Sequence, residues 1–346
     1  MNEAFPRPGQ LVSLGPYRGE HGVALRAGIS IGIPLLLLWR VGHLDLALYA
    51  AFGSFAAIFG RTVPLGPRLR MQAVVGGTLV LSVLLDTTIG LSGLRAFLVI
   101  PVAAAWAPMV AILAHRERWH PPGALFQVFA LGACSSIPAT RSDLGLAAAL
   151  SVGAALLALL VTLIAGTGSR LLGRRSRPDP APPVVPVLPE WRLRHYLARY
   201  SLGIVIAGGL ATALGVVGHP YWAMVAVVVP MAAPDTPGRL TRAAHRLLGT
   251  LLGVLAAWIV LSIGLPAPAL IGFAVVMQIG AELFVGRNYG VALLFVTPLA
   301  LSMVQLAHPL PVAGLVRDRA LETLLGVVVA VVISLLTHER RQDADG

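Results

Sequence analysis

Residues 219–230 read HPYWAMVAVVVP, and they lead through Asp235 to RLLGTLLG at residues 246–253. The first run is apolar but short, it opens with a proline and two aromatics, and it closes on Pro230. Because proline removes a backbone donor, regular helical hydrogen bonding is expected to fail near the end of this run. The second run opens a longer apolar helix with one arginine and two glycines. The stretch therefore predicts a short, interrupted membrane helix, a basic hinge, and a full-length helix that turns back.

Composition places the whole chain in the membrane. Hydrophobic residues make up 57% of the 346 and charged residues only 12%, with a mean hydropathy of +0.81, far from the values of a soluble domain. The net charge of +11 comes from arginines scattered between apolar runs. That pattern is typical of the positive-inside bias of membrane proteins rather than of a nucleic-acid surface. We therefore expect the lipid bilayer, and no nucleic acid, as a partner.

The residue types that the sequence lacks exclude several chemistries. All 26 residues of the Lys+Arg count are arginine, so a Walker A phosphate loop and a Schiff-base lysine are both excluded. The single cysteine, Cys134, can form neither an intrachain disulfide nor a CxxC metal site. No HExxH pattern and no convincing Ser/His/Asp set is present in the sequence. The sequence predicts no enzyme, no bound metal and no cofactor.

Long apolar runs predict an all-α polytopic membrane protein with about twelve transmembrane helices. The expected spans are 22–40, 44–60, 69–88, 95–114, 121–138 and 143–165 in the first half, and 196–217, 219–234, 240–263, 266–285, 288–307 and 315–337 in the second. An arginine- and proline-rich segment between the halves is expected to be extended and cytoplasmic. The expected organisation is a first membrane repeat at 1–165, this linker at 166–194, and a second repeat at 195–346.

The distribution of arginine predicts which loops face the cytoplasm. With both termini inside, most arginines fall in cytoplasmic loops, and the outer side keeps only Arg40, Arg95, Arg141, Arg317 and Arg319. Arginine in place of lysine, with abundant glycine, proline and alanine, is typical of GC-rich bacterial genomes. We expect a multi-pass protein of a bacterial inner membrane, with a short cytoplasmic lead before the first span.

The two halves resemble each other at one constant offset. His43 aligns with His219, Arg70 with Arg246, Gly77 with Gly253, and Arg141 with Arg317, without gaps. Because an even number of spans separates these positions, the two copies would have the same orientation in the membrane. The sequence predicts two parallel six-helix repeats. Gly53-Ser54 falls near the position of Pro230, which gives a pair of interrupted segments in corresponding places, a pointer to a transport site.

The aromatic opening of the key stretch has two interpretations. Tyr221 and Trp222 are common residue types at membrane interfaces, so they are expected either to anchor the chain there or to form a gate or a stacking surface for a substrate. His219 is a candidate proton relay because an imidazole titrates near neutral pH. The break at Pro230 either exposes backbone groups to a water-filled site or only bends a helix for packing.

The long helix of the key stretch also has two interpretations. Arg246 either binds an anion from the cytoplasmic side or extends its guanidinium to the lipid headgroups. The glycines that follow predict close helix packing, as do small residues elsewhere. The expected packing positions are Gly249, Thr250, Gly253, Gly28, Gly32 and Gly77.

Ionisable residues inside apolar runs are costly and therefore candidates for function. Glu282 lies one turn after Gln278 and is the first choice for a coupling residue. Glu322 follows Arg319 by three residues, so it is either a proton carrier or half of an ion pair within one helix. The full set of transport candidates is His43, Asp45, Arg70, His219, Tyr221, Trp222, Pro230, Asp235, Arg246, Gln278, Glu282 and Glu322.

The second half resembles the fusaric acid resistance and aromatic acid exporter family, whose pattern is an HPxW opening, a short span, a polar hinge and a helix beginning RxxGTxxG. Here these positions are His219, Pro220 and Trp222, followed by Arg246 to Gly253. The resemblance implies an inner-membrane protein related to proton-driven efflux components for aromatic carboxylates. Related plant malate channels imply an anion pore between two six-helix units. Unlike the larger exporters, the chain has no sizeable cytoplasmic domain between or after its halves.

These observations predict an efflux transporter of organic, mainly aromatic, anions that exchanges its substrate for protons. Two alternatives remain: a passive anion channel, and a non-transporting membrane scaffold or subunit. The expected partners are the bilayer and a small organic anion, and a homo-oligomer is left open.

Overall fold

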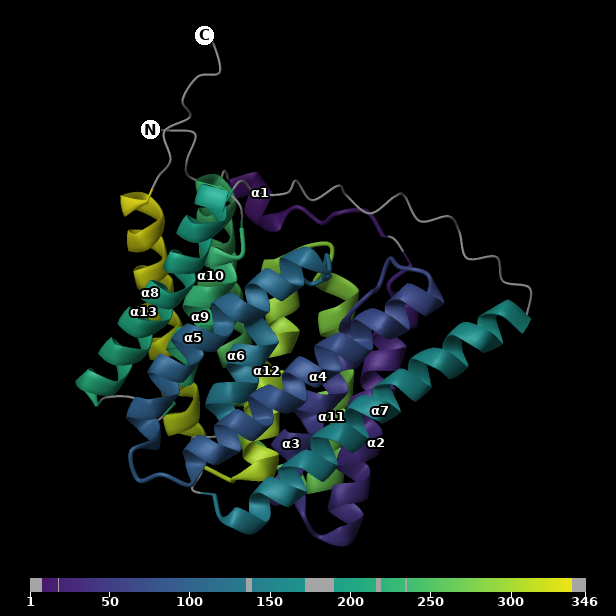
Figure 1. Cartoon of the computed structure of the whole chain (residues 1–346). Helices are drawn as coiled ribbons and strands as arrows, with labels where there is room; N and C mark the ends of the chain where they lie inside the picture. Colours follow the sequence, from purple (N-terminus) through teal and green to yellow (C-terminus); the bar gives the residue numbers. More distant parts are fainter. Residues whose placement is uncertain are drawn as a thin grey trace.

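The computed structural model describes residues 8–17, 19–134, 139–171, 190–215, 219–233 and 235–337, and within these ranges every regular element is a helix. Nine helices among the described residues are long and apolar enough to cross a membrane. They are α2 (His21–Val41), α4 (Leu65–Gly90), α5 (Arg95–Arg116), α7 (Arg141–Leu171), α8 (Glu190–Leu214), α10 (Thr236–Ser262), α11 (Ala267–Phe284), α12 (Tyr289–Ala307) and α13 (Val312–Leu336) (Figure 1). A multi-pass helical membrane protein, as expected, is confirmed.

Three of the predicted spans are short helices instead. The 44–60 region forms η1 (Leu44–Leu46), α3 (Ala47–Ser54) and η2 (Phe55–Ile58), the 121–138 region forms α6 (Leu125–Ala133), and the 219–234 region forms α9 (Tyr221–Met231). Eleven residues of α9 rise only about 16 Å, about half of a bilayer core. Hydropathy predicts apolar helices in these segments but overestimates their length.

Local sequence explains where two of the short helices begin and end. Pro220 precedes the first residue of α9, where a missing N–H costs no intrahelical hydrogen bond. Pro230 lies in the last turn, where it cannot donate the hydrogen bond to the carbonyl oxygen four residues earlier, and the helix ends one residue later at Met231. The α3–η2 segment ends at Ile58, two residues before Gly60, whose φ of +73° suits glycine. Asp235 then starts α10, because its carboxylate accepts a hydrogen bond from the Gly238 N–H at 2.8 Å.

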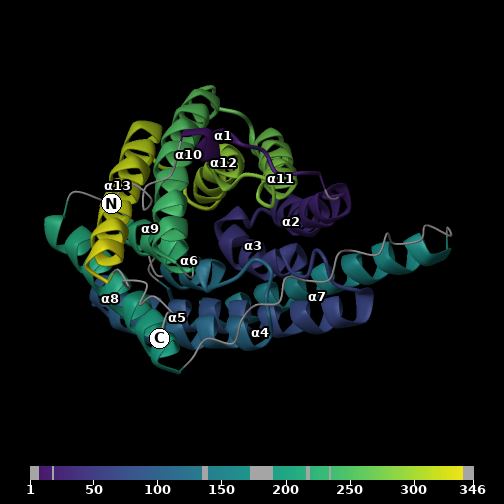
Figure 2. The same ribbon diagram turned by 90° about the horizontal axis from the view of Figure 1, so that it is seen from above.

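The short helices lie in the middle of the molecule. Figure 2, seen from above, shows α3, α6 and α9 enclosed by the long helices. The helices of the two halves have corresponding neighbours: α4 packs on α6 and α7, as α10 packs on α12 and α13, while α3 packs on α7 as α9 packs on α13. Across the halves, α2 packs on α11 and α5 on α8. The long helices therefore enclose a central region to which both halves contribute short helices.

Glycines allow several of these helices to approach closely. A Cβ at Gly253 would lie 2.7 Å from the Leu293 carbonyl oxygen of α12, and Gly249 faces the same helix with Thr250 buried beside it. Gly28 and Gly32 of α2 face Ile279 and Val275 of α11. Gly77 differs, since a Cβ there would meet nothing within 4 Å, while its neighbour Gly76 faces Ala155 and Ala56.

The N-terminal residues pack across one end of the bundle. The end of α1 (Pro8–Val12) and the residues that follow it, together residues 11–15, form what we call the N-terminal strap. Asn288 donates its amide to the carbonyl oxygens of Leu11 and Ser13 at 2.9 Å, and Gly15 and Arg287 bond in both directions at 3.0 Å. The strap therefore joins the beginning of the chain to the loop before α12.

The predicted linker begins later and ends earlier than expected from the sequence. Helix α7 continues to Leu171 and α8 begins at Glu190, so both helices extend into the 166–194 range. The remainder of that range, like the first seven residues and the tail after residue 337, lies outside the described residues.

Candidate functional site: a central cavity with buried arginines

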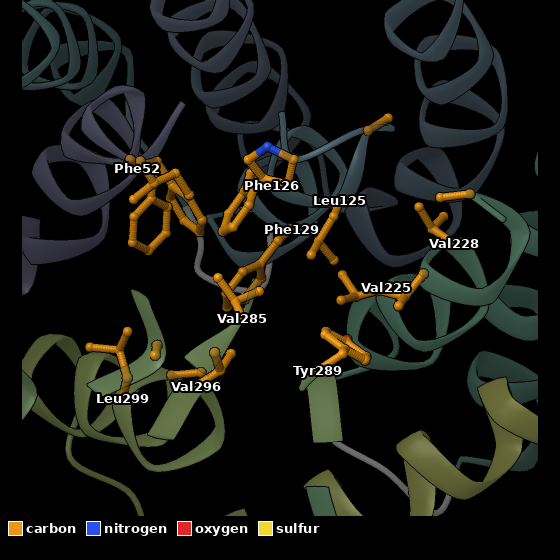
Figure 3. A pocket seen from close by; sticks show the side chains of 18 of the residues that line it. Phe52, Leu125, Phe126, Phe129, Val225, Val228, Val285, Tyr289, Val296 and Leu299 are labelled. Atoms are coloured by element: carbon orange, nitrogen blue, oxygen red, sulfur yellow. The ribbon is translucent and has the colours of Figure 1, made fainter. Parts of the chain in front are cut away.

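A cavity of about 240 Å³ lies between the two halves. Its wall is made by α3 and η2, by α6, by α9, and by the inner faces of α10, α11 and α12. Figure 3 shows Phe126 and Phe129 of α6 on one side, and Val296 and Leu299 of α12 facing them across the space. The wall is mostly apolar, and its polar members are Arg61, Tyr200, Arg242, Arg246, Gln278, Glu282, Tyr289 and Arg319.

Arg246 reaches the cavity from α10, and only 2% of the residue is exposed. One of its terminal nitrogens donates a hydrogen bond to the Tyr289 hydroxyl at 3.0 Å. Its Nε and its other terminal nitrogen are buried without a partner. The guanidinium is thus turned inward, and the lipid-headgroup interpretation of Arg246 does not fit this position.

A second guanidinium, that of Arg319 on α13, reaches the same wall. It is also 2% exposed, lies 4.9 Å from the ring centre of Trp222, and has Nε and one terminal nitrogen buried without a partner. The charges of Arg246 and Arg319 act on each other. Two like charges with unpartnered donors in an apolar wall are costly unless an anion joins them. The arrangement can therefore bind a carboxylate or a similar anion.

An ion pair between the halves forms another part of the wall. Arg61, in the loop after η2, donates to the Glu282 carboxylate of α11 at 2.6 Å and to the Glu282 carbonyl oxygen at 3.2 Å. Gln278, one turn earlier, lies 3.4 Å from the other carboxylate oxygen. The predicted pair Gln278 and Glu282 thus reaches the cavity, with its acid held by an arginine of the other half.

The aromatic opening is buried rather than placed in a lipid-facing belt. Trp222 is fully buried between its stacking partner His219, at 4.6 Å, and the guanidinium of Arg319. Tyr221 is 2% exposed and stacks on Phe129 of the cavity wall at 6.0 Å. The belt interpretation is wrong for these two residues, because a short helix in the middle of the fold carries its first turn inward.

Glu322 supports this aromatic group from α13. It is fully buried, and one carboxylate oxygen accepts the backbone N–H of His219 at 2.9 Å. The other oxygen has no partner. Its predicted alternative, an ion pair with Arg319, does not form, since that arginine lies over Trp222 instead.

The imidazole of His219 lies outside the membrane-spanning helices and is nearly enclosed. Its Nδ1 is 3.8 Å from a carboxylate oxygen of Asp318, a contact in which the imidazole carries charge only when protonated. Burial lowers the pKa of His219 below its ordinary value of 6.5, Asp318 opposes that shift, and Arg319 adds to it. A neutral imidazole therefore fits its place between Trp222 and Tyr221.

The three first-half candidates, and Asp235 of the second half, lie away from the cavity. His43 and Asp45 are exposed and 3.8 Å apart. Arg70 is exposed and forms an ion pair with Glu117 at 3.2 Å. Asp235 is an exposed helix cap, and Pro230 is buried in α9 between two residues that line the cavity, Val229 and Ala232. The structure does not bring His43, Asp45, Arg70 or Asp235 to the site.

Several residues of the wall were not predicted as site residues. The sequence interpretation placed Arg61 on the cytoplasmic side and Arg319 near the outer end of the last predicted span, and it singled out neither Tyr289 nor the four phenylalanines 52, 55, 126 and 129. The signal that was available is the interrupted 44–60 segment, because a loop that follows a short helix starts at membrane depth. Among the described residues no group of three His, Cys, Asp or Glu side chains could hold a metal ion.

Fold and site together define a multi-pass helical membrane protein with an arginine-bearing central cavity. Residues 204–333 match the family model described as fusaric acid resistance protein-like, a stretch that contains both HPYW and RLLGTLLG. The resemblance predicted from those motifs is thereby confirmed for this region, and it indicates a membrane transporter. No curated protein and no solved structure gives a significant match to the chain.

Proposed function

We propose that this protein exports small organic anions with an aromatic body across a bacterial inner membrane, and that the central cavity is its substrate site. The observation that carries the proposal is the pair of buried guanidinium groups of Arg246 and Arg319, each with its Nε and one terminal nitrogen without a partner, in an otherwise phenylalanine-rich wall. A carboxylate would supply the missing acceptors for both groups. A ring attached to that carboxylate would pack on the phenylalanines.

The size of the cavity supports a small substrate. A dry cavity of about 150 Å³ holds benzene, and the cavity here measures about 240 Å³. The larger volume leaves room for one aromatic ring bearing a carboxylate. A two-ring acid would need the wall to move. Uptake should therefore favour benzoate-sized acids over larger ones.

The alternation of access is proposed to come from two parallel six-helix repeats, residues 1–165 and 195–346, that move against each other. Support comes from the constant sequence offset and from the corresponding neighbours of α4 and α10. The arginine-rich loops are proposed to face the cytoplasm, together with both termini. Cysteines introduced at Arg116 and at Arg95, in a Cys134→Ala background, should react with impermeant reagents from opposite sides.

Proton exchange is proposed as the driving force, with Glu322 as the carrier in preference to Glu282. Glu282 is already bonded to Arg61 at 2.6 Å, so a proton on its carboxylate would have to displace that guanidinium. Glu322 has one oxygen without a partner and lies beside Arg319 of the cavity wall, with His219, Tyr221 and Asp318 around it. A proton taken by Glu322 would be exchanged as the anion leaves Arg319.

Purified protein in proteoliposomes tests these statements. Uptake of labelled benzoate, a two-ring acid and an aliphatic acid is measured with and without an imposed pH gradient. We expect benzoate accumulation that depends on the gradient. Currents that persist without any gradient would instead indicate a passive channel, and no uptake of any acid would support a scaffold.

A further inference from the structure

Glu282 has a second arginine within its electrostatic reach. Arg26, in the second turn of α2, is 8% exposed, and the charges of Glu282 and Arg61 both act on it. Its Nε and one terminal nitrogen are buried without a hydrogen-bond partner. In the described structure Glu282 is bonded to Arg61 and not to Arg26. The Glu282 carboxylate thus interacts with two guanidinium groups, but it accepts a hydrogen bond only from that of Arg61.

The two arginines differ in their access to the cavity. Arg61 and Glu282 line its wall, whereas Arg26 is not part of it. Nearby Arg68 cannot replace either of them, since its Nε bonds the Gly60 carbonyl oxygen at 2.8 Å and a terminal nitrogen bonds that of Val63 at 2.6 Å. An anion in the cavity can therefore reach Arg61 but not Arg26.

We propose that Glu282 is a resident carboxylate that occupies Arg61 only while the cavity is empty. A substrate carboxylate takes its place on Arg61, and Glu282 turns to the unpartnered nitrogens of Arg26. The exchange needs no proton, since one carboxylate replaces another on Arg61 and the negative charge that the substrate adds is balanced by Arg26. Arg61 then becomes a third substrate-binding arginine, in addition to Arg246 and Arg319. The inference rests on the proposed function only in taking the substrate to be an organic anion.

The exchange has a structural consequence. Arg61 is in the first half, between η2 and α4, and Glu282 is on α11 of the second. Their contact joins the halves at the cavity wall. Arg26 lies on α2, which already packs on α11. Moving the Glu282 carboxylate from Arg61 to Arg26 would leave the loop after η2 with its bond to the Glu282 carbonyl oxygen at 3.2 Å, so that binding of the anion itself loosens one contact between the halves.

Benzoate binding to the purified protein, measured by titration calorimetry, tests the exchange through five variants. Glu282→Gln removes the competitor and should tighten binding by about tenfold, while Arg61→Gln should weaken it by about tenfold. Arg26→Gln should weaken binding in the wild-type background, because the displaced Glu282 has no new partner. In the Glu282→Gln background the same change should have no effect, and Arg26→Lys should keep most of the wild-type affinity.

The outcomes separate this inference from the proposed function. If benzoate binds but Arg26→Gln weakens binding equally in both backgrounds, the exchange is wrong and the anion site stands. If Glu282→Gln weakens binding although its thermal unfolding in detergent matches wild type, the exchange is also wrong. If wild type binds none of the tested acids, the anion site itself is overturned, and the exchange with it.

Discussion

His43 and His219 occupy the same place in the two halves of the sequence, as do Arg70 and Arg246, yet their surroundings differ. Arg70 is exposed and forms an ion pair with Glu117, whereas Arg246 is buried in the cavity wall. His43 faces solvent beside Asp45, whereas His219 stacks on Trp222. Matching positions therefore carry the arrangement of helices in both halves, while the chemistry of the cavity is concentrated in the second.

Replacing the two arginines gives the sharpest test of that comparison. Arg246→Gln should lower benzoate uptake by about 100-fold, because a charged donor in an apolar wall is lost, at about 2.7 kcal/mol. Arg70→Gln should change uptake by less than about twofold, since an exposed ion pair contributes little. Initial rates in proteoliposomes measure both. Equal losses in the two variants would mean that the first half also carries substrate.

The paired glycines test packing rather than binding. Gly253→Ala should destabilise the protein by about 2 kcal/mol, because its Cβ would collide with the backbone of α12. Gly77→Ala should be neutral or stabilising by about 0.5 kcal/mol, since nothing lies within 4 Å of that Cβ. Thermal unfolding in detergent measures both changes. Similar destabilisation at Gly77 would indicate a neighbour supplied by another copy of the chain.

The acids of the two halves should differ in coupling. Glu322→Gln is expected to lower accumulation driven by a pH gradient by about tenfold, because a neutral amide cannot exchange the proton. Uptake down a benzoate gradient should persist. Asp45→Asn, at an exposed acid of the first half, serves as the control and should leave the response to the gradient intact. Retained coupling in Glu322→Gln would exclude Glu322 as the carrier.

The smallest effect is expected at the histidines. His219→Ala removes a ring stacked on Trp222 and should cost about 1 kcal/mol at pH 7.5, whereas His43→Ala should have no measurable effect. Because the folded-state pKa of His219 is lowered, the unfolded state binds its proton first as the pH falls below about 6.5. Wild type should lose stability through that window, and His219→Ala should lose less. Unfolding temperatures at pH 7.5 and pH 5 measure the difference.

Apolar runs were enough to locate every helix of the core, but not to tell a full span from a half span. Gly60 and Pro230 mark ends that depend on what packs around them, so the depth of α3 and α9 follows from tertiary structure. For this reason the sequence pattern predicted a lipid interface for Trp222 and a cytoplasmic loop for Arg61, whereas Trp222 is buried and Arg61 lines the cavity. Glu282, with Gln278 one turn before it, was found by the cost of charge in a membrane, and Arg246 by its place at the start of RLLGTLLG; neither signal needs knowledge of depth. Asp235 could not be distinguished from these site residues, because an aspartate that caps a helix and an aspartate in a site are the same residue in the sequence.

The N-terminal strap has a consequence for the order in which the protein is assembled. Its partners, His245, Arg287 and Asn288, are synthesised more than 200 residues after Leu11 and Ser13. The strap therefore has nothing to dock on while the first half enters the membrane, and it closes only after the loop before α12 has been made. Resistance of the strap to a protease would therefore show that synthesis and folding have passed the loop before α12.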